Sequence, residues 1–457
     1  MTATLRLTDG LHKRLLDTAT QPLEHAGVLL AAISDTNGVV TAVGVDWLPV
    51  PDDAYERQGV DHLTVTSDGY MPALSIAEQR GLTAIWVHSH PGDGSEVHAS
   101  DYDARVNQQL GDVFALRTGT DRYGYLVIGH RAGRLTFTGG ITGSITSSID
   151  RLTTIGDRFR FETADDNPQH TPTEVYDRNV RAFGPAIQSV IGSLTVAIVG
   201  SGGTGSAVAE QLVRLGVRSF LLLDPDTLSA SNTTRVYGST PGDVGRAKVE
   251  VLADHLTRIA PDAVVVRQQT SVLQQHAARL LQTADIVFGC TDDNAGRLRL
   301  SRLPYFTLTP VIDCGVQIEA TPQLTINGIF GRVTTLHPGP ACLTCRDRID
   351  LARAMAEERA ADEQQALEKE GYAPALGATE PAVVAFTTLV AATAVGELLE
   401  RLIGYGDTPA PTEQLLMIHD RSIRTNRIPP TPGHYCDPNV VTIGAGATTY
   451  LGLNWAS

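Results

Sequence analysis

Residues 194–205 read LTVAIVGSGGTG, an apolar run followed at once by a glycine-rich turn. A second apolar run, SFLLL, follows at residues 219–223, and the residues between the two runs are typical of a helix that ends at Gly216. Strand, glycine turn, helix and strand in this order predict a βαβ unit of a parallel sheet. Four glycines fall where bare N–H groups and a helix N-terminus can receive phosphates: Gly200, Gly202, Gly203 and Gly205.

The glycine turn alone leaves two interpretations open. Asp224 follows the second strand and could bind ribose hydroxyls, so the pattern also suits a nicotinamide oxidoreductase. Further along, residues 223–235 read LDPDTLSASNTTR, residues 243–248 read DVGRAK and residues 290–297 read CTDDNAGR. These segments offer cations that can spread charge over a triphosphate and carboxylates that can hold magnesium. A dehydrogenase has no use for Arg235 and Lys248 together, which favours adenylation of a carboxylate.

This series of motifs resembles the ThiF/MoeB and ubiquitin-activating enzyme family, whose pattern includes Asp-x-Asp, here Asp224 and Asp226. The resemblance implies ATP and magnesium as ligands. It also implies roles for single residues: Asp224 at the ribose, Asn232, Arg235 and Lys248 at the phosphates, and Asp292 at the magnesium ion.

The last of these motifs departs from the family pattern, which has a single Asp-Asn with an arginine four residues after the Asn. Here Asp292 and Asp293 precede Asn294, and counting back from Arg297 makes Asp293 replace the usual Asn. Asp292 is therefore the expected magnesium ligand, and Asp293 is the alternative.

Residues 175–183, VYDRNVRAF, resemble the segment from which homodimers of this family send an arginine into the ATP site of the partner. The resemblance gives that role to Arg178 and implies a homodimer through the adenylation domain. The alternative is an ordinary surface arginine on an amphipathic helix.

A second constellation lies near the N-terminus, where residues 82–91 read LTAIWVHSHP. They predict a strand that ends in His88 and His90, and the period of two puts both imidazoles on one face. Asp103 lies twelve residues beyond Pro91, in a predicted helix that Ser100 would cap. Three protein ligands with a fourth position left to water are the pattern of catalytic zinc.

This spacing resembles the JAMM/MPN metalloprotease family, whose pattern is an early glutamate, His-Ser/Thr-His-Pro, a short loop and Ser-x-x-Asp. The resemblance covers about the first 140 residues and implies a cytidine-deaminase-like α/β fold with zinc on His88, His90 and Asp103. It implies that Glu24 is the general base and acid, and that Ser100 helps to hold the oxyanion. One alternative is that these residues only cap a strand and a helix. Another is a metal-free docking module.

The cysteines suggest a further zinc site. Cys342 and Cys345 lie where many relatives carry half of a zinc knot, and the other half is reduced to His434 and Cys436. The alternatives are an empty remnant or a redox pair. Ubiquitin-activating enzymes that form a thioester carry a cysteine in the crossover loop, but residues 346–381 contain none, which favours the absence of an internal thioester. Thr379 is a candidate hydroxyl acceptor.

Charge and composition exclude other partners. Thirty-six Lys and Arg against 51 Asp and Glu give a net charge of −15, which argues against nucleic acid and against an acidic membrane surface. The opening MTATLRLTDG lacks the features of a secretory signal, and the apolar stretch at 382–396 is shorter than a membrane span, so we expect a cytoplasmic protein.

The motifs predict two α/β domains: a JAMM domain at 1–140, a linker at 141–173, a Rossmann-like adenylation domain with a mixed sheet at 174–430, and a tail at 431–457 that completes the zinc site. Such a fusion resembles those of bacterial ubiquitin-like operons. It implies cleavage at the C-terminal glycine of a ubiquitin-like protein and activation of that carboxylate with ATP, together with a possible conjugating-enzyme partner. The alternative is a sulfur-carrier adenylyltransferase and protease for thiocarboxylate chemistry in cofactor or siderophore synthesis.

Overall fold

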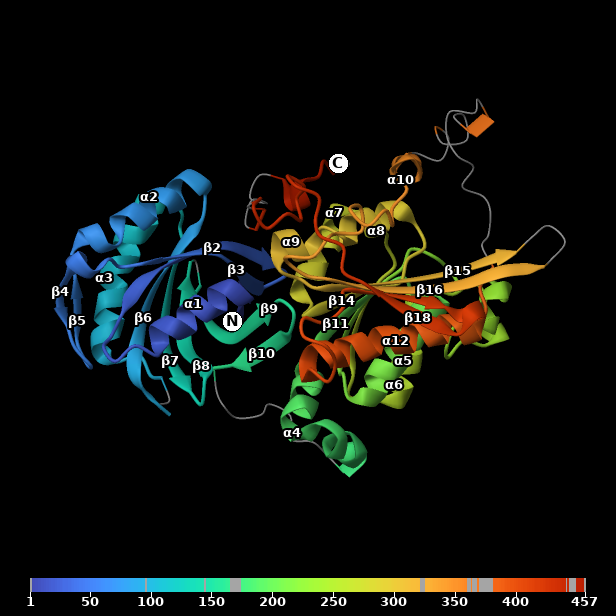
Figure 1. The fold of residues 1–457 in the computed structure, drawn as a ribbon, viewed down its shortest axis with the longest axis horizontal. Coiled ribbons are helices and arrows are strands. Elements are labelled where there is room, and N and C mark those ends of the chain that lie inside the picture. Colours follow the sequence, from blue (N-terminus) through green and yellow to red (C-terminus); the bar gives the residue numbers. More distant parts are fainter. Residues whose placement is uncertain are drawn as a thin grey trace. The chain divides into compact units, whose positions relative to one another are not determined.

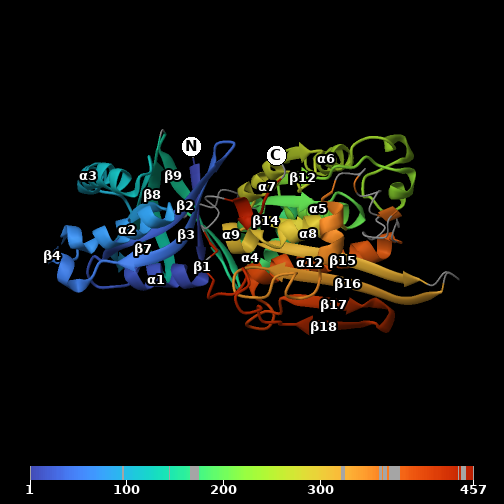
Figure 2. The same ribbon diagram turned by 90° about the horizontal axis from the view of Figure 1, so that it is seen from above.

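The computed structural model describes residues 2–94, 97–143, 145–164, 174–320, 325–359, 363, 368–369, 381–440, 442–443 and 449–455. The chain divides into two compact units, each with its own eight-stranded sheet (Figures 1 and 2). The first unit comprises Met1–Asn167, Phe306–Leu308 and Val441–Gly452, and the second comprises Pro168–Tyr305, Thr309–Val440 and Leu453–Ser457.

The first unit alternates strands and helices, as its sequence predicts. Its strands are β1 (Thr2–Thr8), β2 (Ala26–Thr36), β3 (Val39–Pro49), β4 (Tyr55–Gln58), β5 (Leu63–Val65), β6 (Thr83–Asp93), β7 (Tyr123–Arg131), β8 (Arg134–Thr142), β9 (Ser147–Ile155) and β10 (Phe159–Thr163). Its helices are α1 (Asp9–Ala19), α2 (Met71–Arg80) and α3 (Asp101–Thr118).

Successive side chains of the strands in this sheet enter two different apolar cores. On β2, Leu29 packs in one core with Leu15 of α1, and its neighbour Leu30 packs in the other with Phe114 of α3. The period of two along a strand explains this alternation, because both faces of the sheet are covered by helices. Burial of each such side chain contributes about 1.5–3 kcal/mol to folding.

The first sheet closes on itself, which the sequence analysis did not anticipate. Its strand order is β1-β3-β2-β6-β7-β8-β9-β10, and β1 also pairs in parallel with β9, from Thr2 opposite Ser148 to Thr8 opposite Ile155. The resulting barrel-like sheet is an α/β arrangement, and it does not by itself show that the unit is a JAMM domain.

The predicted linker at 141–173 is wrong over most of its described length, because β9 and β10 lie within it. Its Ser- and Thr-rich composition suggested a linker, but threonine is β-branched and suits strands. Ile149, Leu152 and Ile155 are buried in β9, so pairing with β1 outweighs the polar composition. The first unit thus extends beyond residue 140 to Asn167.

The second unit contains the predicted βαβ element and a mixed sheet. Its strands are β11 (Thr195–Val199), β12 (Ser219–Leu223), β13 (Val264–Gln268), β14 (Ile286–Gly289), β15 (Val311–Ala320), β16 (Ile326–Leu336), β17 (Glu413–Met417) and β18 (Ser422–Asn426). Its helices are α4 (Asp177–Ser193), α5 (Gly203–Leu215), α6 (Lys248–Ile259), α7 (Gln275–Leu280), α8 (Asn294–Leu300), α10 (Leu351–Glu357) and α12 (Val384–Ile403), and α9 (Leu303–Thr307) lies between α8 and β15.

The order of the second sheet is β13-β12-β11-β14-β15-β16-β17-β18. Strands β13 to β15 are parallel, and β15 to β18 are antiparallel. The predicted Rossmann-like fold with a mixed sheet is therefore confirmed. The apolar stretch near 382–396 belongs to α12, which packs against α5, β15 and β16. Among the described residues, no helix is long and apolar enough to cross a membrane.

Candidate functional site

The glycine-rich turn joins β11 to α5. Gly200 has φ of +93°, and a Cβ there would lie 2.6 Å from the carbonyl oxygen of Cys290. At Gly205 a Cβ would lie 1.8 Å from the carbonyl oxygen of Gly200, so only glycine lets α5 start this close to the turn. Gly202, the N-cap of α5, would have no atom within 4 Å of its Cβ, and Gly203 begins the helix. The turn is thus packed on one side and open at Gly202.

The order of the strands puts this turn at a switch point of the sheet. β11 lies between β12 and β14, and the chain reaches β12 first and β14 only later. In open α/β sheets, the carboxyl ends of two such strands form the crevice that receives a ligand. The predicted phosphate turn follows β11 and the predicted magnesium loop follows β14, so the fold brings the two together.

Asp224, predicted to bind ribose, is buried just after β12 and holds the glycine turn. Its Oδ2 accepts a hydrogen bond from the backbone N–H of Ser201 at 2.6 Å, and its Oδ1 accepts one from Asp226 at 2.9 Å. Burial raises the pKa of Asp224, and the nearby charge of Lys248 opposes this rise. Each carboxylate oxygen keeps a second lone pair, so Asp224 can hold the turn and still accept from a ribose hydroxyl.

Lys248 is the first residue of α6, and its side chain is turned toward the end of β12. Its Nζ donates to Asp226 Oδ2 at 2.7 Å, and its backbone N–H donates to the carbonyl oxygen of Asp226 at 3.0 Å. Thr227 pairs with Ala247 in an antiparallel bridge, which keeps the two segments in register. The lysine is therefore held close to the predicted ribose and phosphate contacts.

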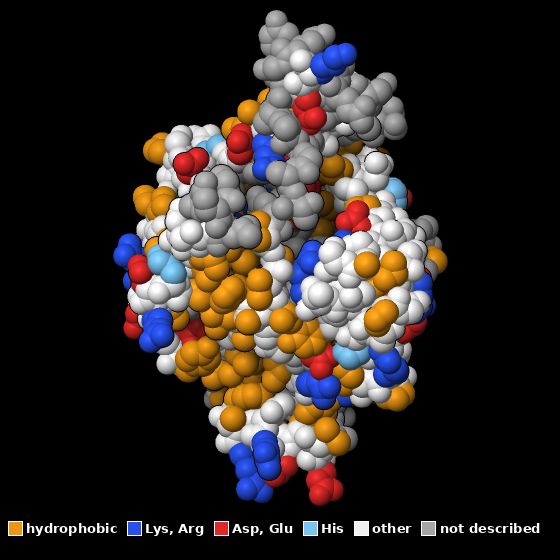
Figure 3. Space-filling view, turned by 90° about the vertical axis from the view of Figure 1, so that its right-hand side faces the viewer, with side chains coloured by type: hydrophobic (Ala, Val, Ile, Leu, Met, Phe, Trp, Pro, Cys, Tyr) orange, Lys and Arg blue, Asp and Glu red, His pale blue; other side chains and the backbone are white. Residues whose placement is uncertain are grey.

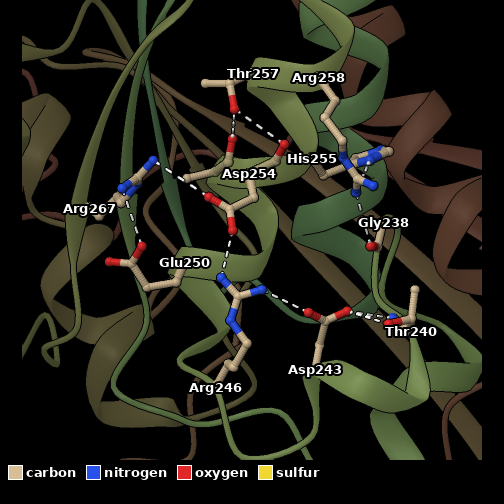
Figure 4. A network of polar contacts seen from close by, with 11 residues as sticks. Gly238, Thr240, Asp243, Arg246, Glu250, Asp254, His255, Thr257, Arg258 and Arg267 are labelled. Atoms are coloured by element: carbon tan, nitrogen blue, oxygen red, sulfur yellow. Dashed lines mark hydrogen bonds and ion pairs between the residues drawn. The ribbon is translucent and has the colours of Figure 1, made fainter.

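A network of charged side chains supports the segment that leads to Lys248 (Figure 4). Arg246 donates from Nη1 to Asp243 Oδ1 at 2.7 Å and from Nη2 to Asp254 Oδ2, on α6, at 2.6 Å. Asp243 also accepts hydrogen bonds from the hydroxyl and N–H groups of Thr240. The hydrogen bonds from Thr240 and Arg246 lower the pKa of Asp243 to about 2, so this carboxylate stays charged at neutral pH.

Asn232 and Arg235, the other predicted phosphate contacts, lie on the loop between β12 and α6. Asn232 Oδ1 accepts from the backbone N–H of Ser229 at 3.0 Å. Arg235 donates from Nη1 to the carbonyl oxygen of Ser231 at 3.0 Å. A Cβ at Gly203 would lie 3.2 Å from Arg235 Cγ, so the arginine lies against the start of α5. Of the two, Arg235 is thus the one that the contacts bring to the glycine turn.

Asp292 and Asp293, which the sequence leaves as alternatives, have different surroundings. Asp293 is the N-cap of α8: its carboxylate accepts from the N–H of Gly296 at 2.5 Å and from the hydroxyl of Thr291. Asp292 is exposed, and within the described part of the chain it makes no hydrogen bond or ion pair. The carboxylate of Asp292 is therefore available for a cation, whereas that of Asp293 is committed to the helix.

A cavity of about 920 Å³ opens beside Asp292. Its walls come from α8, α10 and the strands β15 to β17, and four arginines line it: Arg297, Arg332, Arg348 and Arg353. None of these arginines has a predicted role in binding. Only Arg297 belongs to a quoted motif, and the others come from segments without one.

Buried carboxylates hold two of these arginines in place. Asp313 Oδ2 lies 2.7 Å from Arg332 Nη2, and Glu413 accepts from Nε and Nη2 of Arg348, both at 3.0 Å. Both acids are fully buried. Burial would raise the pKa of Glu413, but the hydrogen bonds and charge of Arg348 lower it. The cavity wall thus carries guanidinium groups that are fixed and largely neutralised, which suits the carbonyl groups of an extended peptide.

Arg178, the predicted trans-acting arginine, lies in the first turn of α4. It is exposed, and among the described residues no side-chain partner holds it. The helix is interrupted further on at Gly184, which has φ of +83° and precedes Pro185. Arg178 is thus accessible to a neighbouring molecule.

The four residues of the predicted second zinc site lie together, although about ninety positions separate the two halves in sequence. His434 Nδ1 lies 3.5, 3.3 and 3.4 Å from the sulfur atoms of Cys342, Cys345 and Cys436, and the last two sulfur atoms lie 3.6 Å apart. A tetrahedral zinc ion with Zn–S of about 2.3 Å and Zn–N of about 2.0 Å would separate its ligands by roughly 3.5–3.8 Å. The donor set and its spacing therefore fit zinc.

The predicted ligands of the first unit also meet. His88 Nε2 lies 3.1 Å from Asp103 Oδ1, and His90 Nε2 lies 3.9 Å from Asp103 Oδ2. His88 Nε2 is buried and makes no hydrogen bond with the described residues, as expected of a nitrogen that faces a cation. All three ligand atoms lie within 4.8 Å of one another, which fits one metal ion.

Ser100, predicted to help hold the oxyanion, contacts this cluster through Asp103. Its hydroxyl and its N–H both donate to Asp103 Oδ2 at 2.7 Å, and together the two residues form a capping box at the start of α3. Burial would raise the pKa of Asp103, but the neighbouring His88 and the hydrogen bonds from Ser100 lower it well below its ordinary value. Asp103 therefore belongs both to the capping pair and to the ligand set, and Ser100 orients this ligand.

Glu24 lies just before β2, the strand that pairs with β6. Ala26 is opposite His88. The N–H of Ser89 donates to the carbonyl oxygen of His25 at 2.8 Å, and the N–H of His25 donates to the hydroxyl of Ser89 at 2.9 Å, which keeps the chain alongside the histidines. Glu24 is buried, and burial raises its pKa while the charge of His88 lowers it. The carboxyl group is thus next to the cluster without being one of its three ligands, as a general base requires.

Comparison with known families covers the second unit. Residues 176–437, more than half of the chain, match the model of the ThiF family. The chain belongs to the ThiF family. The match includes the glycine turn, the Asp292 loop and all four residues of the Cys/His cluster. Of the two interpretations of the glycine turn, the ThiF match supports adenylation and not a nicotinamide oxidoreductase.

Two curated relatives of the ThiF unit are named as an adenylyltransferase and as a modifier-activating enzyme. The molybdopterin-synthase adenylyltransferase of Escherichia coli (strain K12) is 32% identical over 176 residues, which cover 38% of this chain and 68% of the relative. Ubiquitin-like modifier-activating enzyme 5 of Drosophila pseudoobscura pseudoobscura is 27% identical over 244 residues, covering 47% of this chain and 59% of the relative. Crystal structures of Escherichia coli MccB are also similar: the complex with AMPCPP and MccA has 15% identity and a TM-score of 0.47, over 59% of this chain and 76% of that one.

The ThiF match begins after the strands of the first unit and does not bear on the JAMM/MPN resemblance, which rests on the sequence motif of Glu24, His88, His90 and Asp103. In the ThiF unit, sequence reasoning missed the arginines and buried acids of the cavity. The only signal for them is the position of Arg297 after the Asp292 motif. Thr379 lies outside the described residues.

Proposed function

We propose that the ThiF unit activates the C-terminal carboxylate of a ubiquitin-like or sulfur-carrier protein by adenylating it with ATP. The observation that carries this proposal is the uncommitted, exposed carboxylate of Asp292 in the wall of a 920 Å³ cavity, beside the glycine turn. The names of the two curated relatives, an adenylyltransferase and a modifier-activating enzyme, support the reaction class.

In the proposed reaction, a carboxylate oxygen of the carrier attacks the α-phosphorus of ATP. The bond from that phosphorus to the bridging oxygen breaks, pyrophosphate leaves, and the carrier becomes an acyl-adenylate. The N–H groups at the start of α5 would receive phosphate oxygens, and Arg235 and Lys248 would stabilise the charge that passes to pyrophosphate. Asp292 would hold magnesium, which, when bound, neutralises part of the triphosphate charge.

The cavity suits the extended C-terminal tail of the carrier. Asp292, where the nucleotide would lie, is part of its lining, and Asp313 and Glu413 hold two of its arginines, Arg332 and Arg348, rather than leaving them free to collapse onto the phosphates. Fixed guanidinium groups can donate to backbone carbonyl oxygens of a tail, and a tail that ends in glycine needs no side-chain pocket at its terminus.

The test is pyrophosphate exchange into ATP by the full chain, with a purified β-grasp protein that ends in glycine and is encoded beside it. Asp292→Asn should lower the exchange rate at least about 100-fold, because the magnesium ligand is lost. Asp293→Asn is the matched control: asparagine is also a good N-cap, so exchange should stay within about threefold of the original. A larger loss of exchange in Asp293→Asn than in Asp292→Asn would show that Asp293 holds the metal. If the unsubstituted chain showed no exchange either with or without the carrier, adenylation would be refuted.

We further propose that the acyl-adenylate passes directly to an acceptor and forms no thioester on this chain. Residues 346–381 contain no cysteine, and three of the five cysteines lie in the Cys/His cluster. The acceptor would be sulfide, a thiol of a conjugating partner or a hydroxyl. A reductant-sensitive adduct of carrier and chain on a gel would overturn this proposal.

For the first unit we propose a zinc-dependent peptidase or isopeptidase that cleaves after the C-terminal glycine of the same carrier. His88, His90 and Asp103 would hold zinc, which, when bound, acidifies a water molecule and polarises the scissile carbonyl. Glu24 would accept the proton of that water and deliver it to the leaving amine, and Ser100 would keep Asp103 oriented. Both reactions would then act on the same C-terminus: cleavage would expose its glycine, and adenylation would activate the carboxylate of that glycine.

Glu24→Gln tests this assignment. The variant should keep zinc at one equivalent in the first unit, because no ligand changes, and should cleave a C-terminally extended carrier about 10²–10⁴-fold more slowly. Adenylation should persist, since its residues lie in the other unit. Cleavage at the original rate would rule out Glu24 as the base, and absence of zinc in the unsubstituted protein would favour a metal-free docking module.

We also propose that the ThiF unit forms a homodimer in which Arg178 reaches the ATP site of the partner. On the face drawn in Figure 3, apolar side chains gather in a broad band. Exposed apolar residues of this unit include Val384 and Leu389 of α12, Val383 just before this helix, and Ile423 of β18. Exposed apolar surface of this kind marks interaction sites in proteins that otherwise bury such side chains.

A further inference from the structure

A carboxylate outside every motif reaches the helix that follows Asp292. Glu357 is the last residue of α10, and its Oε2 accepts a hydrogen bond from the backbone N–H of Ala295 at 2.8 Å. Its Oε1 accepts from Nε of Arg353, one turn earlier on α10, at 3.1 Å. The side chain of Glu357 is only 11% exposed, so the hydrogen bond to α8 is largely shielded from water.

This contact completes the first turn of α8. Asp293 takes the N–H of Gly296, and Glu357 takes the N–H of the preceding residue, Ala295. At the other end of α10, the N–H of Asp350 donates to the side-chain oxygen of Asn294 at 3.0 Å. The N–H groups in the first turn of a helix have no partner within the helix. Without Glu357, the N–H group of Ala295, three residues after Asp292, would lose its partner.

The same helix also borders the cavity. Asp350, Leu351 and Arg353, at the start of α10, line one part of the cavity. Asp292 and Asn294, at the start of α8, line another part. A tail that enters the cavity would therefore touch the helix that holds the Asp292 loop. The two walls are joined by the Glu357 carboxylate, although 62 residues separate it from Ala295.

We propose that Glu357 is a positioning residue for adenylation, which fixes the Asp292 loop for magnesium from the wall of the carrier cavity. The inference rests on the proposed role of Asp292. Glu357 would touch neither the nucleotide nor the carrier. Its loss should therefore raise the magnesium concentration that ATP binding requires, and only while Asp292 is present.

The experiment measures binding of AMPCPP, a non-hydrolysable ATP analogue, to the full chain by calorimetry at a series of magnesium concentrations. Glu357→Ala should raise the magnesium concentration for half-maximal binding by about tenfold, the effect of losing one charge-assisted hydrogen bond. Glu357→Gln keeps an acceptor for Ala295 and should shift it less, by about threefold. Binding of the analogue without magnesium should not change.

Glu358→Ala is the matched control. Glu358 is the next residue, and it pairs with Arg299 of α8 at 2.5 Å without touching the first turn of the helix. It should shift the magnesium requirement less than about twofold, because the Glu358 carboxylate is itself 37% exposed and the buried Arg299 keeps its hydrogen bond to the carbonyl oxygen of Ala295. Equal shifts in the Glu357 and Glu358 variants would mean a general loosening of α10 and would overturn the proposal.

A double substitution separates this inference from the proposed function. In an Asp292→Asn background, Glu357→Ala should cause no further shift, because the group it positions is gone. A full additional shift would overturn the positioning role while leaving adenylation intact. If the unsubstituted protein showed no magnesium-dependent binding of AMPCPP, both would fall. Thermal melting checks folding, and Glu357→Gln carries the test if the alanine variant unfolds.

Discussion

The guanidinium of Arg246 joins two carboxylates, Asp243 on the loop before α6 and Asp254 on the helix itself (Figure 4). Lys248 lies between these two anchors. Asp254→Asn should release one of them and raise the KM for ATP by about two- to threefold, with kcat little changed, because exposed ion pairs are individually weak. The measurement is the pyrophosphate-exchange rate against ATP concentration. Added salt should shrink the difference between variant and parent.

Asp262→Asn is the control for that substitution. Asp254 lies near both Arg246 and Arg267, at 2.6 and 3.8 Å, whereas Asp262 makes one ion pair, with Arg218 at 3.1 Å, and follows the far end of α6 from Lys248. Its loss should leave the KM for ATP unchanged. Similar KM values for both variants would show that the charged network does not support the lysine.

At the scale of the helix, α4 carries Arg178 in its first turn and is broken at Gly184. Arg178→Ala should leave the unit folded and dimeric but should slow exchange, because a cation at the phosphates is lost. Mixing this variant with Asp292→Asn subunits should restore part of the activity, since one site of each mixed dimer keeps both groups. Size-exclusion chromatography with two differently tagged subunits verifies mixing. Failure of verified mixed dimers to recover activity would place the arginine outside the partner's site.

At the scale of the molecule, the Cys/His cluster ties the segment after β16 to the segment after β18. The donor set predicts zinc here, so Cys436→Ser should lower the zinc content by one equivalent and the melting temperature of the ThiF unit by about 5–10 °C, because metal binding contributes to folding. Pyrophosphate exchange should survive at lower temperature. Zinc content and differential scanning calorimetry provide the measurements.

A chelator supplies the control for that prediction. It should lower the melting temperature of a His88→Ala variant, in which the Cys/His cluster is the one metal-ligand group left intact among the described residues, and should not shift the melting temperature of a protein with both substitutions. An unchanged melting temperature after verified loss of zinc would mean that hydrogen bonds among the thiols and His434 suffice to join the two segments.

Several features follow from short stretches of sequence alone. The glycine turn, the βαβ unit and the placement of His88 and His90 on one strand face depend on residues close together in the chain, whose backbone preferences and periodicities act locally. The Asp292 motif favoured Asp292 as the magnesium ligand and left Asp293 as the alternative. The choice depends on whether a carboxylate caps α8, which only the path of the chain around Gly296 decides.

The tertiary structure decided the rest, because it depends on pairs of residues far apart in sequence. Closure of the first sheet needs β1 beside β9, and a polar, Thr-rich strand reads as a linker until its partner is known. Arg332 and Arg348 are fixed in the cavity wall by the buried Asp313 and Glu413; Glu413 lies 65 positions from Arg348 in sequence. The sequence by itself determined the chemical groups and the family to which they belong. Long-range packing, which local patterns do not encode, determined which of those groups are free to react and which are already bound.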